Sequence, residues 1–464
     1  MIQALKTQRT NYVLIALNIV VAAAFFVLHF NELSPDNYTY LGIANGILNG
    51  EYSYWYFLEQ YVPDTLRTPG YPFFLAAILF VGGNVTVIKV IQLLLYIASI
   101  LLLNKAIIKF KNDYLFSNLF LLQIIPCVFL PYYAPLIYAE MLVVFLISLL
   151  VYVYVIVSES SKLKPIMMGI ILSLIFYSKP IFLFFPVALL LANIVFYKFQ
   201  KVKADFIMVF VFFLMALPYG FWNYKNHNTF KLTPLEGGGG ILYLGFWQHK
   251  LPNFNEYNYW GSWMGDEMIK FVVPQEVEKN IAQWNTEWNY IDSVCAQTLS
   301  TKDSLLIEEM NKYFPRLFRT YHTDYTSCRE KILIQLSLEH IKNEPVYYLK
   351  TRIYTFFRLQ ITGINFKKFN RAKGIGGKIE AVYPFIITGL NTLLFLVAVL
   401  YLIPALFRKR DPIILFIVIL TLYGIVIHIP MAMLSRYTIP VRLLMILIST
   451  ELICALFKKY VFRK

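Results

Sequence analysis

The sequence predicts an all-α polytopic membrane protein with about ten transmembrane helices and a small mixed extracytoplasmic domain. The chain has 464 residues, of which 58% are hydrophobic and only 15% are charged. Its mean hydropathy of +0.58 lies far outside the range of an ordinary soluble domain. Apolar runs long enough to cross a bilayer recur along the chain, and short basic segments separate them. Hydropathy, run length and loop charge therefore point to the same fold class.

The apolar runs give the order of the expected spans. They occupy residues 12–30, 85–104, 114–133, 136–156, 206–222, 383–406, 412–430 and 438–457. The stretch 165–197 would be roughly 50 Å long as one helix, well beyond a hydrocarbon core of about 30 Å, and it is too short for two full spans. We therefore expect two short helices that meet at 178–180.

The basic residues set the expected topology. The net charge is +15, and Lys and Arg gather in four loops and in the C-terminal tail. The loops lie at 105–111, 162–164, 198–203 and 408–410. With two helices in 165–197, all of these clusters fall on one side, as expected of cytoplasmic loops. Both termini are then cytoplasmic, and topology rather than a nucleic-acid partner explains the basicity.

A cleavable signal peptide is the alternative to a first span. Lys6 and Arg9 precede the apolar run, and small residues follow at 22–24, as in many signal peptides. The run continues through Leu28, however, and its full length favours an uncleaved helix.

The topology divides the chain into three parts. Residues 1–222 form an N-terminal transmembrane module with an outer loop at 31–84. Residues 223–380 form an extracytoplasmic domain, and residues 381–464 hold the C-terminal transmembrane helices. Within the outer loop, the short apolar piece 71–80 is expected at the membrane interface.

Tryptophans and cysteines add little to this picture. Six of the seven tryptophans lie between positions 222 and 288, where an interfacial belt and local core explains them better than sugar stacking. Cys127 and Cys454 lie in apolar runs and are expected to be core residues. Cys295 and Cys328 share the polar segment, where an oxidising compartment permits a bridge without requiring one.

A set of ionisable side chains lies at the outer ends of the expected spans. Its members are Asp36, Arg67, Glu140, Lys179 and Arg436. A charge within apolar sequence costs on the order of 2.5 to 3.5 kcal/mol, so such groups tend to face a cavity and to have partners. Taken singly, each has a structural explanation as an interfacial anchor, a snorkelling lysine or a loop acid. Together they favour a site for a phosphate-bearing substrate, with cations to bind the phosphate and an ionised carboxylate to accept a proton.

Several motifs follow one another along the chain. In the first outer loop, Asp36 is followed by YLGIA at 40–44 and by RTPGYPFFLA at 67–76. YAE lies at 138–140, Lys179 precedes Pro180, PYGFWNYKN lies at 218–226, and SRYTIP lies at 435–440. In this order, over nearly the whole chain, these motifs resemble the bacterial GT-C glycosyltransferases, and SRYTIP is close to the family's Arg-Tyr-x-x-Pro. The family includes the dolichyl-phosphate-mannose protein mannosyltransferase-like enzymes and the lipid A aminoarabinose transferase.

The resemblance implies a role for each matched residue. Asp36 is the catalytic acid or base, while Arg67, Lys179 and Arg436 bind the donor phosphate. Sugar or acceptor binding falls to Glu140, Tyr71 and Tyr437, and metal binding is the other role open to Glu140.

The sequence assigns no certain cofactor and leaves a divalent metal ion open. Many relatives carry a second acid after the first, but this chain has Asn37 there, which weakens the case for a metal bound by an acidic pair. No His-rich spacing or Cys cluster favours zinc. His29 and His428 are expected to be satisfied structural residues. The glycine run at 237–240 lacks the Walker lysine spacing and is expected to be a flexible turn.

The expected function is an inverting membrane glycosyltransferase of the bacterial inner membrane, with its active site on the outer face. It would move a sugar from a polyprenyl-phosphate donor to a lipid, glycan or protein acceptor. The alternative is a transporter or flippase of a lipid-linked or anionic substrate, which should show internal repeats and charges near mid-membrane. A glycan polymerase or ligase of unrelated fold is a second rival.

Overall fold

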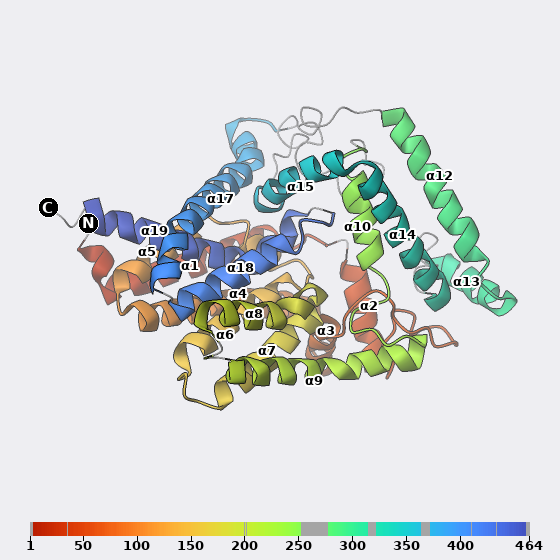
Figure 1. The fold of residues 1–464 in the computed structure, drawn as a ribbon, viewed down its shortest axis with the longest axis horizontal. Coiled ribbons are helices and arrows are strands. Elements are labelled where there is room, and N and C mark those ends of the chain that lie inside the picture. The colour runs from red at the N-terminus through yellow and green to blue at the C-terminus, as the bar shows by residue number, and fades with distance from the viewer. Residues whose placement is uncertain are drawn as a thin grey trace.

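The computed structural model describes residues 3–34, 36–198, 200, 202–251, 277–313, 322–362, 372–409, 411–432 and 434–460. The described part of the chain forms helices and no strand. The predicted all-α class is confirmed in these residues, whereas the mixed character expected of the extracytoplasmic domain is not seen there. The helices form a bundle at one end of an elongated molecule and a smaller helical layer at the other (Figure 1).

In the residues that the structure describes, twelve α-helices belong to the bundle and its outer loop. They are α1 Gln8–Leu28, α2 Asn37–Leu48, α3 Gly70–Phe80, α4 Val85–Lys111, α5 Tyr114–Ile124, α6 Glu140–Ile156, α7 Leu163–Ser178, α8 Phe185–Tyr197, α9 Val202–His227, α17 Ile375–Lys409, α18 Pro412–Val426 and α19 Arg442–Tyr460. Short 3-10 helices lie at Ala4–Lys6, Pro131–Tyr133, Pro180–Phe184 and Ser435–Val441. Within the described ranges, five further helices form the second layer: α10 Gly238–Trp247, α12 Val277–Ala296, α13 Thr301–Tyr313, α14 Thr323–Asn343 and α15 Pro345–Gln360.

Six helical segments are long and apolar enough to cross a membrane in the described residues. They are Gln8–Leu28, Val85–Lys111, Pro180–Tyr197, Val202–His227, Ile375–Pro404 and Arg436–Lys459. Five shorter apolar helices, among them α5, α6 and α18, fall below that length. The chain is therefore an integral membrane protein by composition and helix length, while the count of about ten spans stays a prediction.

Proline positions explain where two expected spans break. The stretch 165–197 forms α7 and α8 with a 3-10 turn at Pro180–Phe184 between them, as predicted from its length. The expected span 114–133 was wrong as a single helix, because α5 ends at Ile124. Pro126 follows two residues later, and a proline lacks the N–H that an α-helix needs to continue. The chain then turns through a 3-10 helix at Pro131–Tyr133.

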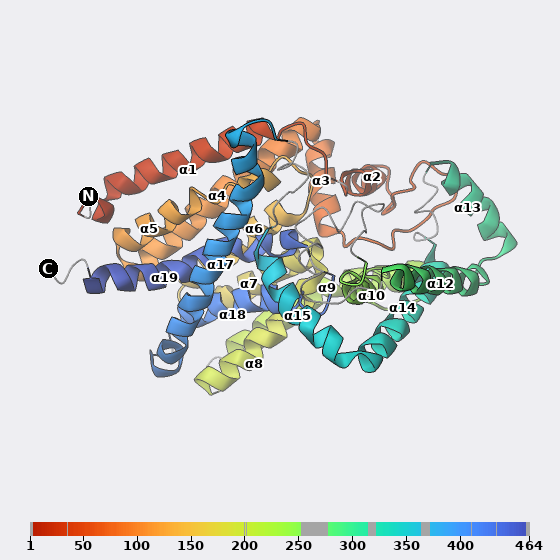
Figure 2. The ribbon, with the colours of Figure 1, turned by 90° about the horizontal axis from the view of Figure 1, so that it is seen from above.

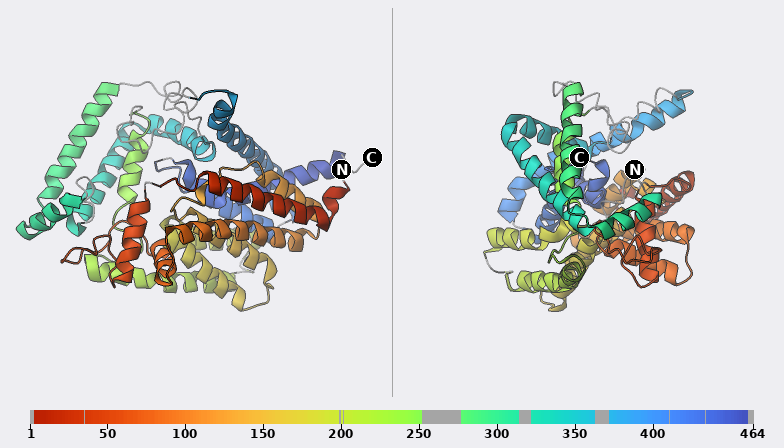
Figure 3. Two further views of the ribbon diagram at one scale, coloured as in Figure 1. Left: turned by 180° about the vertical axis from the view of Figure 1, so that it is seen from behind. Right: turned by 90° about the vertical axis from the view of Figure 1, so that its right-hand side faces the viewer.

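Both termini lie at the same end of the bundle (Figures 1 and 2). Ion pairs tie the helix ends together there, since Lys111 contacts Glu451 and Lys458 lies 3.2 Å from Asp113. The layer formed by α10 and α12 to α15 lies at the opposite end, as the view from behind also shows (Figure 3). The start of α19 therefore faces that layer, close to where α1 ends and α6 begins.

A glycine run begins α10 and does not form the flexible turn expected from the sequence. The backbone N–H groups of Gly239 and Gly240 donate to the Glu330 carboxylate of α14, at 2.7 and 3.3 Å. A Cβ on Gly239 would lie 2.6 Å from the Glu330 backbone oxygen, so glycine lets the two helices approach. The carboxylate satisfies N–H groups that a helix start leaves without intrahelical partners.

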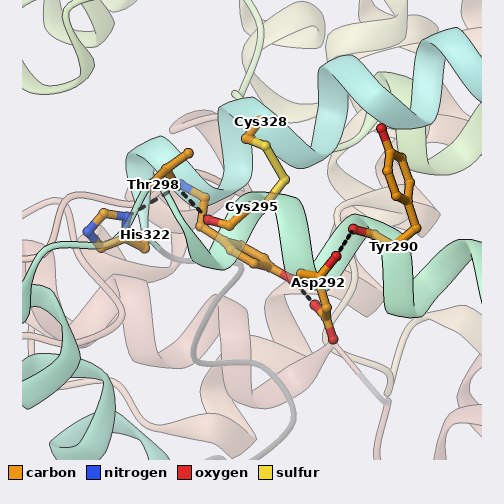
Figure 4. Close-up of a disulfide and its surroundings, with 8 residues drawn as sticks. Tyr290, Asp292, Cys295, Thr298, His322 and Cys328 are labelled. Atoms are coloured by element: carbon orange, nitrogen blue, oxygen red, sulfur yellow. Dashed lines mark hydrogen bonds between the residues drawn. A yellow bond between two sulfur atoms is a disulfide. The ribbon is translucent and has the colours of Figure 1, made fainter.

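Aromatic side chains and one disulfide hold the outer layer together. Three of the tryptophans, Trp247, Trp284 and Trp288, pack with Tyr243 in a local core. Trp260 and Trp263 lie outside the described residues. Cys295 of α12 and Cys328 of α14 are disulfide-bonded, with their Cα atoms 5.6 Å apart (Figure 4). The bridge that the sequence left open is therefore present.

Removing this bridge should destabilise the outer layer. The disulfide closes a loop with a sequence separation of 33, and the loss of such a constraint costs about 3 to 4 kcal/mol in the chain-entropy model. We expect Cys295→Ser with Cys328→Ser to raise the rate of limited proteolysis within the outer layer. Cys454→Ser, which removes a buried free thiol in α19, is the matched control. Equal proteolysis of the double variant and the wild type would contradict a stabilising role.

Candidate active site at the outer-layer ends of the bundle helices

Asp36 lies between two guanidinium groups. Arg67 Nη2 is 3.1 Å from Asp36 Oδ1, and Arg436 Nη2 is 3.0 Å from Asp36 Oδ2. The Asp36 side chain is only 8% exposed. A buried carboxylate is costly unless it is paired and hydrogen-bonded, and two arginines provide both conditions. Each carboxylate oxygen of Asp36 therefore contacts a separate cation.

Local structure places this acid at the start of a helix. Asp36 directly precedes α2, in the N-cap position. On the preceding side, the Ser34 hydroxyl donates to the Ile137 carbonyl at 3.0 Å, which joins the segment after α1 to the one before α6. Asn37 follows Asp36 and is buried, and its side-chain oxygen has no hydrogen-bond partner. An acceptor without a partner thus lies next to the acid.

Glu140 and Lys179 form a second pair. Glu140 begins α6, Lys179 follows α7, and their Oε1 and Nζ atoms are 3.4 Å apart. Both side chains are largely buried, at 7% and 14% exposure. The Tyr437 ring connects the two pairs, because Lys179 Nζ lies 5.5 Å and Arg436 Cζ 5.9 Å from its centre.

Aromatic rings line the cations of the site. The Arg67 guanidinium lies over Tyr40 at 4.7 Å, and the Arg436 guanidinium lies over Tyr138 at 4.4 Å. Contacts between a cation and the face of a ring are attractive and hold the planar guanidinium in a fixed orientation. The rings therefore help to aim both guanidinium groups at Asp36.

Tyr71 lies behind Tyr40. Its ring meets Tyr40 edge to face at 4.8 Å, and its hydroxyl donates to Gln92 Oε1 at 2.7 Å. Gln92 of α4 in turn donates to the carbonyls of Ala134 and Leu136. Because Tyr71 is fully buried and its hydroxyl is engaged, it supports Tyr40 in this conformation, and the sugar or acceptor contact expected for it stays a prediction.

The structure thus brings all seven residues singled out in the sequence into one connected cluster. They come from the segment after α1, from α3 and its preceding loop, from the start of α6, from the end of α7 and from the turn before α19. The three cations and two carboxylates leave one positive charge in excess, so the cluster suits an anionic ligand. The roles assigned to the individual residues are not decided by their positions.

His428, expected from the sequence to be a satisfied structural residue, is a neighbour of the cluster. Its ring stacks on Tyr437 with 5.1 Å between centres, and its Nδ1 is hydrogen-bonded to the Gly424 carbonyl at 2.8 Å. A histidine at the end of an apolar run gives no sequence signal for such a contact. His29 is a satisfied structural residue, since its Nδ1 lies 2.6 Å from Glu32 Oε1.

A divalent metal ion does not fit the arrangement around Asp36. Both carboxylate oxygens face guanidinium groups within 3.1 Å, and these would repel a bound cation. Asn37 supplies a neutral oxygen where a second acid would have offered charge. No group of three or more His, Cys, Asp or Glu side chains lies in a metal-binding arrangement in the described ranges.

A cavity of about 950 Å³ lies beside the cluster. Side chains of α2, α3, α6, α7 and α9 line it, and most of them are apolar or aromatic. Its lining includes Pro69, Leu142 and Ser178, which are close chain neighbours of Arg67, Glu140 and Lys179. The cavity therefore adjoins the backbone segments that carry these three charged side chains.

Comparisons with known proteins add one finding. No family model and no curated protein match the chain. Among solved structures, the chain is similar to ArnT from Cupriavidus metallidurans, whose crystal structure holds bound undecaprenyl phosphate. The identity is 11% and the TM-score 0.36, and the match covers 95% of this chain and 77% of the ArnT chain.

Proposed function

We propose that this protein is an inverting membrane glycosyltransferase that takes a sugar from a polyprenyl-phosphate donor and passes it to an acceptor hydroxyl. One observation carries the proposal. A buried carboxylate, Asp36, is held between Arg67 and Arg436, beside an apolar cavity among the membrane helices. A base, a phosphate-binding pair of cations and a route for a lipid tail are the parts that this reaction needs.

The phosphate of the donor would replace Asp36 on the two arginines. Guanidinium groups bind phosphate through paired N–H donors, as they bind carboxylate. Donor binding therefore shifts Arg67 and Arg436 from the carboxylate to the phosphate, while Lys179 adds a third positive charge. Asp36 then loses its contacts with both guanidinium groups and can accept a proton from the acceptor hydroxyl.

The lipid tail would occupy the apolar cavity. Phe73, Phe74 and Leu146 are among its lining residues, and contact with such side chains favours a polyprenyl chain over water. Trp222 and Tyr219, which also line the cavity, stack on each other at 5.8 Å. The length of the tail beyond the cavity would lie in the bilayer.

The chemical step is a direct displacement. The acceptor oxygen attacks the anomeric carbon and forms the new glycosidic bond, while the bond from that carbon to the phosphate oxygen breaks. The proton of the hydroxyl passes to Asp36, and the bonding electrons leave with the lipid phosphate. Arg67, Lys179 and Arg436 stabilise the charge that builds on the departing oxygen, and a single displacement inverts the configuration of the sugar carbon.

The proposed site faces the outer side of a bacterial inner membrane, and both termini are cytoplasmic. The disulfide between Cys295 and Cys328 supports this orientation, because such bonds persist in oxidising compartments. The division into a transmembrane module 1–222, an extracytoplasmic domain 223–380 and C-terminal helices 381–464 belongs to the same proposal. Lipids, glycans and proteins are all open as acceptors, and membrane lipids surround the spans.

Binding of undecaprenyl phosphate by the protein in lipid nanodiscs tests the proposal. We expect saturable binding that undecaprenol, which lacks the phosphate, does not match. Incubation with a sugar-loaded polyprenyl phosphate and an envelope lipid extract should then release free lipid phosphate. Movement of the intact lipid across a proteoliposome membrane, with no release of phosphate, would instead favour the transporter.

A further inference from the structure

The turn 64–67 carries Arg67, and several elements hold it. Its backbone is hydrogen-bonded to the preceding loop, to α9 and to the segment before α10. The Asp64 N–H donates to the Tyr52 carbonyl at 3.1 Å, and the Glu236 N–H donates to the Thr65 carbonyl at 2.9 Å. His227 Nε2 lies 3.2 Å from the Asp64 carbonyl oxygen. The turn is therefore a junction between the outer loop and the outer layer.

Both the N–H and the carbonyl of Arg67 are hydrogen-bonded. Its carbonyl accepts hydrogen bonds from the hydroxyls of Tyr52 and Tyr219, at 2.8 and 3.0 Å. Its N–H donates to Asp64 Oδ1 at 2.7 Å, and the Leu66 N–H donates to the same oxygen at 2.9 Å. One carboxylate oxygen thus closes the turn from which the Arg67 side chain extends to Asp36.

The Asp64 carboxylate has an unusual environment. The residue is only 1% exposed, and its second oxygen, Oδ2, has no hydrogen-bond partner. A buried charge with half of its acceptor capacity unused is costly. Asparagine would supply the same accepting oxygen without the charge, so the need to close the turn does not by itself explain an aspartate.

We propose that Asp64 is a positioning residue that holds Arg67 against Asp36 and the donor phosphate only while its carboxylate is charged. The inference rests on the proposed function, because it concerns how the same site binds phosphate. Hydrogen bonds to an ionised acceptor are roughly twice as strong as neutral ones. A proton on Asp64 weakens the two bonds that fix the Arg67 backbone, and the guanidinium then loses its fixed position.

The surroundings make this proton uptake accessible near neutral pH. Burial raises the pKa of Asp64 to about 6, although the N–H groups of Arg67 and Leu66 and the Arg67 charge oppose the rise. The other charged or titratable groups around the turn are Glu236, which raises the pKa further, Tyr52, Tyr61, Tyr219 and His227. Asp64 is therefore ionised at pH 7.5 and mostly neutral at pH 5.

Protonation of Asp64 would weaken phosphate binding at low pH without unfolding the protein. An acid whose pKa is higher in the folded than in the unfolded state binds more protons when folded. Between about pH 6 and the ordinary aspartate pKa of 3.8, protonation of Asp64 therefore favours the folded protein. Weaker binding with intact structure in this window is the signature of the proposed switch.

Binding of undecaprenyl phosphate to wild type and to D64N, measured in nanodiscs at pH 7.5 and pH 5, tests the inference. At pH 7.5 we expect D64N to bind about threefold to tenfold more weakly, because its amide oxygen accepts without charge. At pH 5 the two proteins should bind alike. Titration of the lipid phosphate affects both proteins equally and cancels from the ratio of their dissociation constants.

Asp303→Asn is the matched control in the outer layer. Hydrogen bonds from Ser300 and His322 lower the pKa of Asp303 to about 2, against the effect of burial, so this carboxylate stays ionised at both pH values. The ratio of the dissociation constants of D303N and wild type should therefore be the same at pH 7.5 and pH 5. A ratio for D64N that is the same at both pH values overturns the inference and leaves the proposed function standing. Failure of the wild type to bind at either pH removes the proposed function itself.

A second measurement applies if D64N does not fold. Infrared difference spectra of the wild type between pH 7.5 and pH 5 should show a buried carboxylic acid forming with a midpoint near 6. Absence of that signal overturns the inference without any variant.

Discussion

Replacing Asp36 with asparagine should strongly reduce the rate of sugar transfer while leaving the protein folded. Asparagine has nearly the same shape but does not accept the proton of the acceptor hydroxyl. General-base catalysis contributes typically 10²- to 10⁴-fold, so we expect a loss of about this size. The measurement is release of free lipid phosphate from the sugar-loaded donor in the presence of acceptor.

The same variant should bind the lipid phosphate at least as tightly as the wild type. In the absence of donor, the Asp36 carboxylate contacts both Arg67 and Arg436, so it competes with the phosphate for them. D36N removes the competing charge. Glu159→Gln, which changes an exposed acid paired with Lys164, is the control and should leave both activity and binding unchanged. Full activity of D36N would exclude Asp36 as the base.

Replacing Arg436 with glutamine should cause the second large loss. It removes a donor to the departing phosphate, a kind of change that typically costs about 10²- to 10³-fold in kcat. Binding of undecaprenyl phosphate should also weaken, and Arg67→Gln should change both quantities in the same direction. Transfer rates and binding constants, measured separately, distinguish the two effects.

Arg436→Lys separates charge from geometry. Lysine keeps the positive charge but does not reproduce the planar fork or its contact with the Tyr138 ring. We expect lysine to restore part of the binding and little of the rate. Arg9→Gln, at the far end of α1, is the control and should leave transfer unchanged. Normal transfer by Arg436→Gln would contradict the proposed role of Arg436.

The helical architecture could largely be predicted from the sequence. Run lengths and basic loops located most apolar helices, and the length of 165–197 together with Pro180 located the break between α7 and α8. The end of α5 at Ile124 was missed because hydropathy continues through Pro126 and Pro131. Hydropathy measures burial in lipid or protein and does not report where the backbone loses its hydrogen bonds.

The members of the charged cluster could be predicted from the sequence, but the ion pairs that they form could not. Asp36 and Arg436 are 400 positions apart in the chain, and only the packing of the bundle makes them partners. The glycine run illustrates the same limit, since Glu330 of α14 decides its conformation. The sequence did not indicate a role for Asp64, because a loop aspartate is ordinarily exposed to solvent. Its environment is unusual because α9 and the segment before α10 bury it.

A structure of the protein with bound undecaprenyl phosphate is the decisive test of the proposed phosphate site. We expect the phosphate to lie within hydrogen-bonding distance of Arg67, Arg436 and Lys179, with the lipid tail in the adjoining cavity. Asp36 should then have moved away from at least one guanidinium group and face the open side of the phosphate. A phosphate bound elsewhere, with Asp36 still paired to both arginines, would exclude the proposed site.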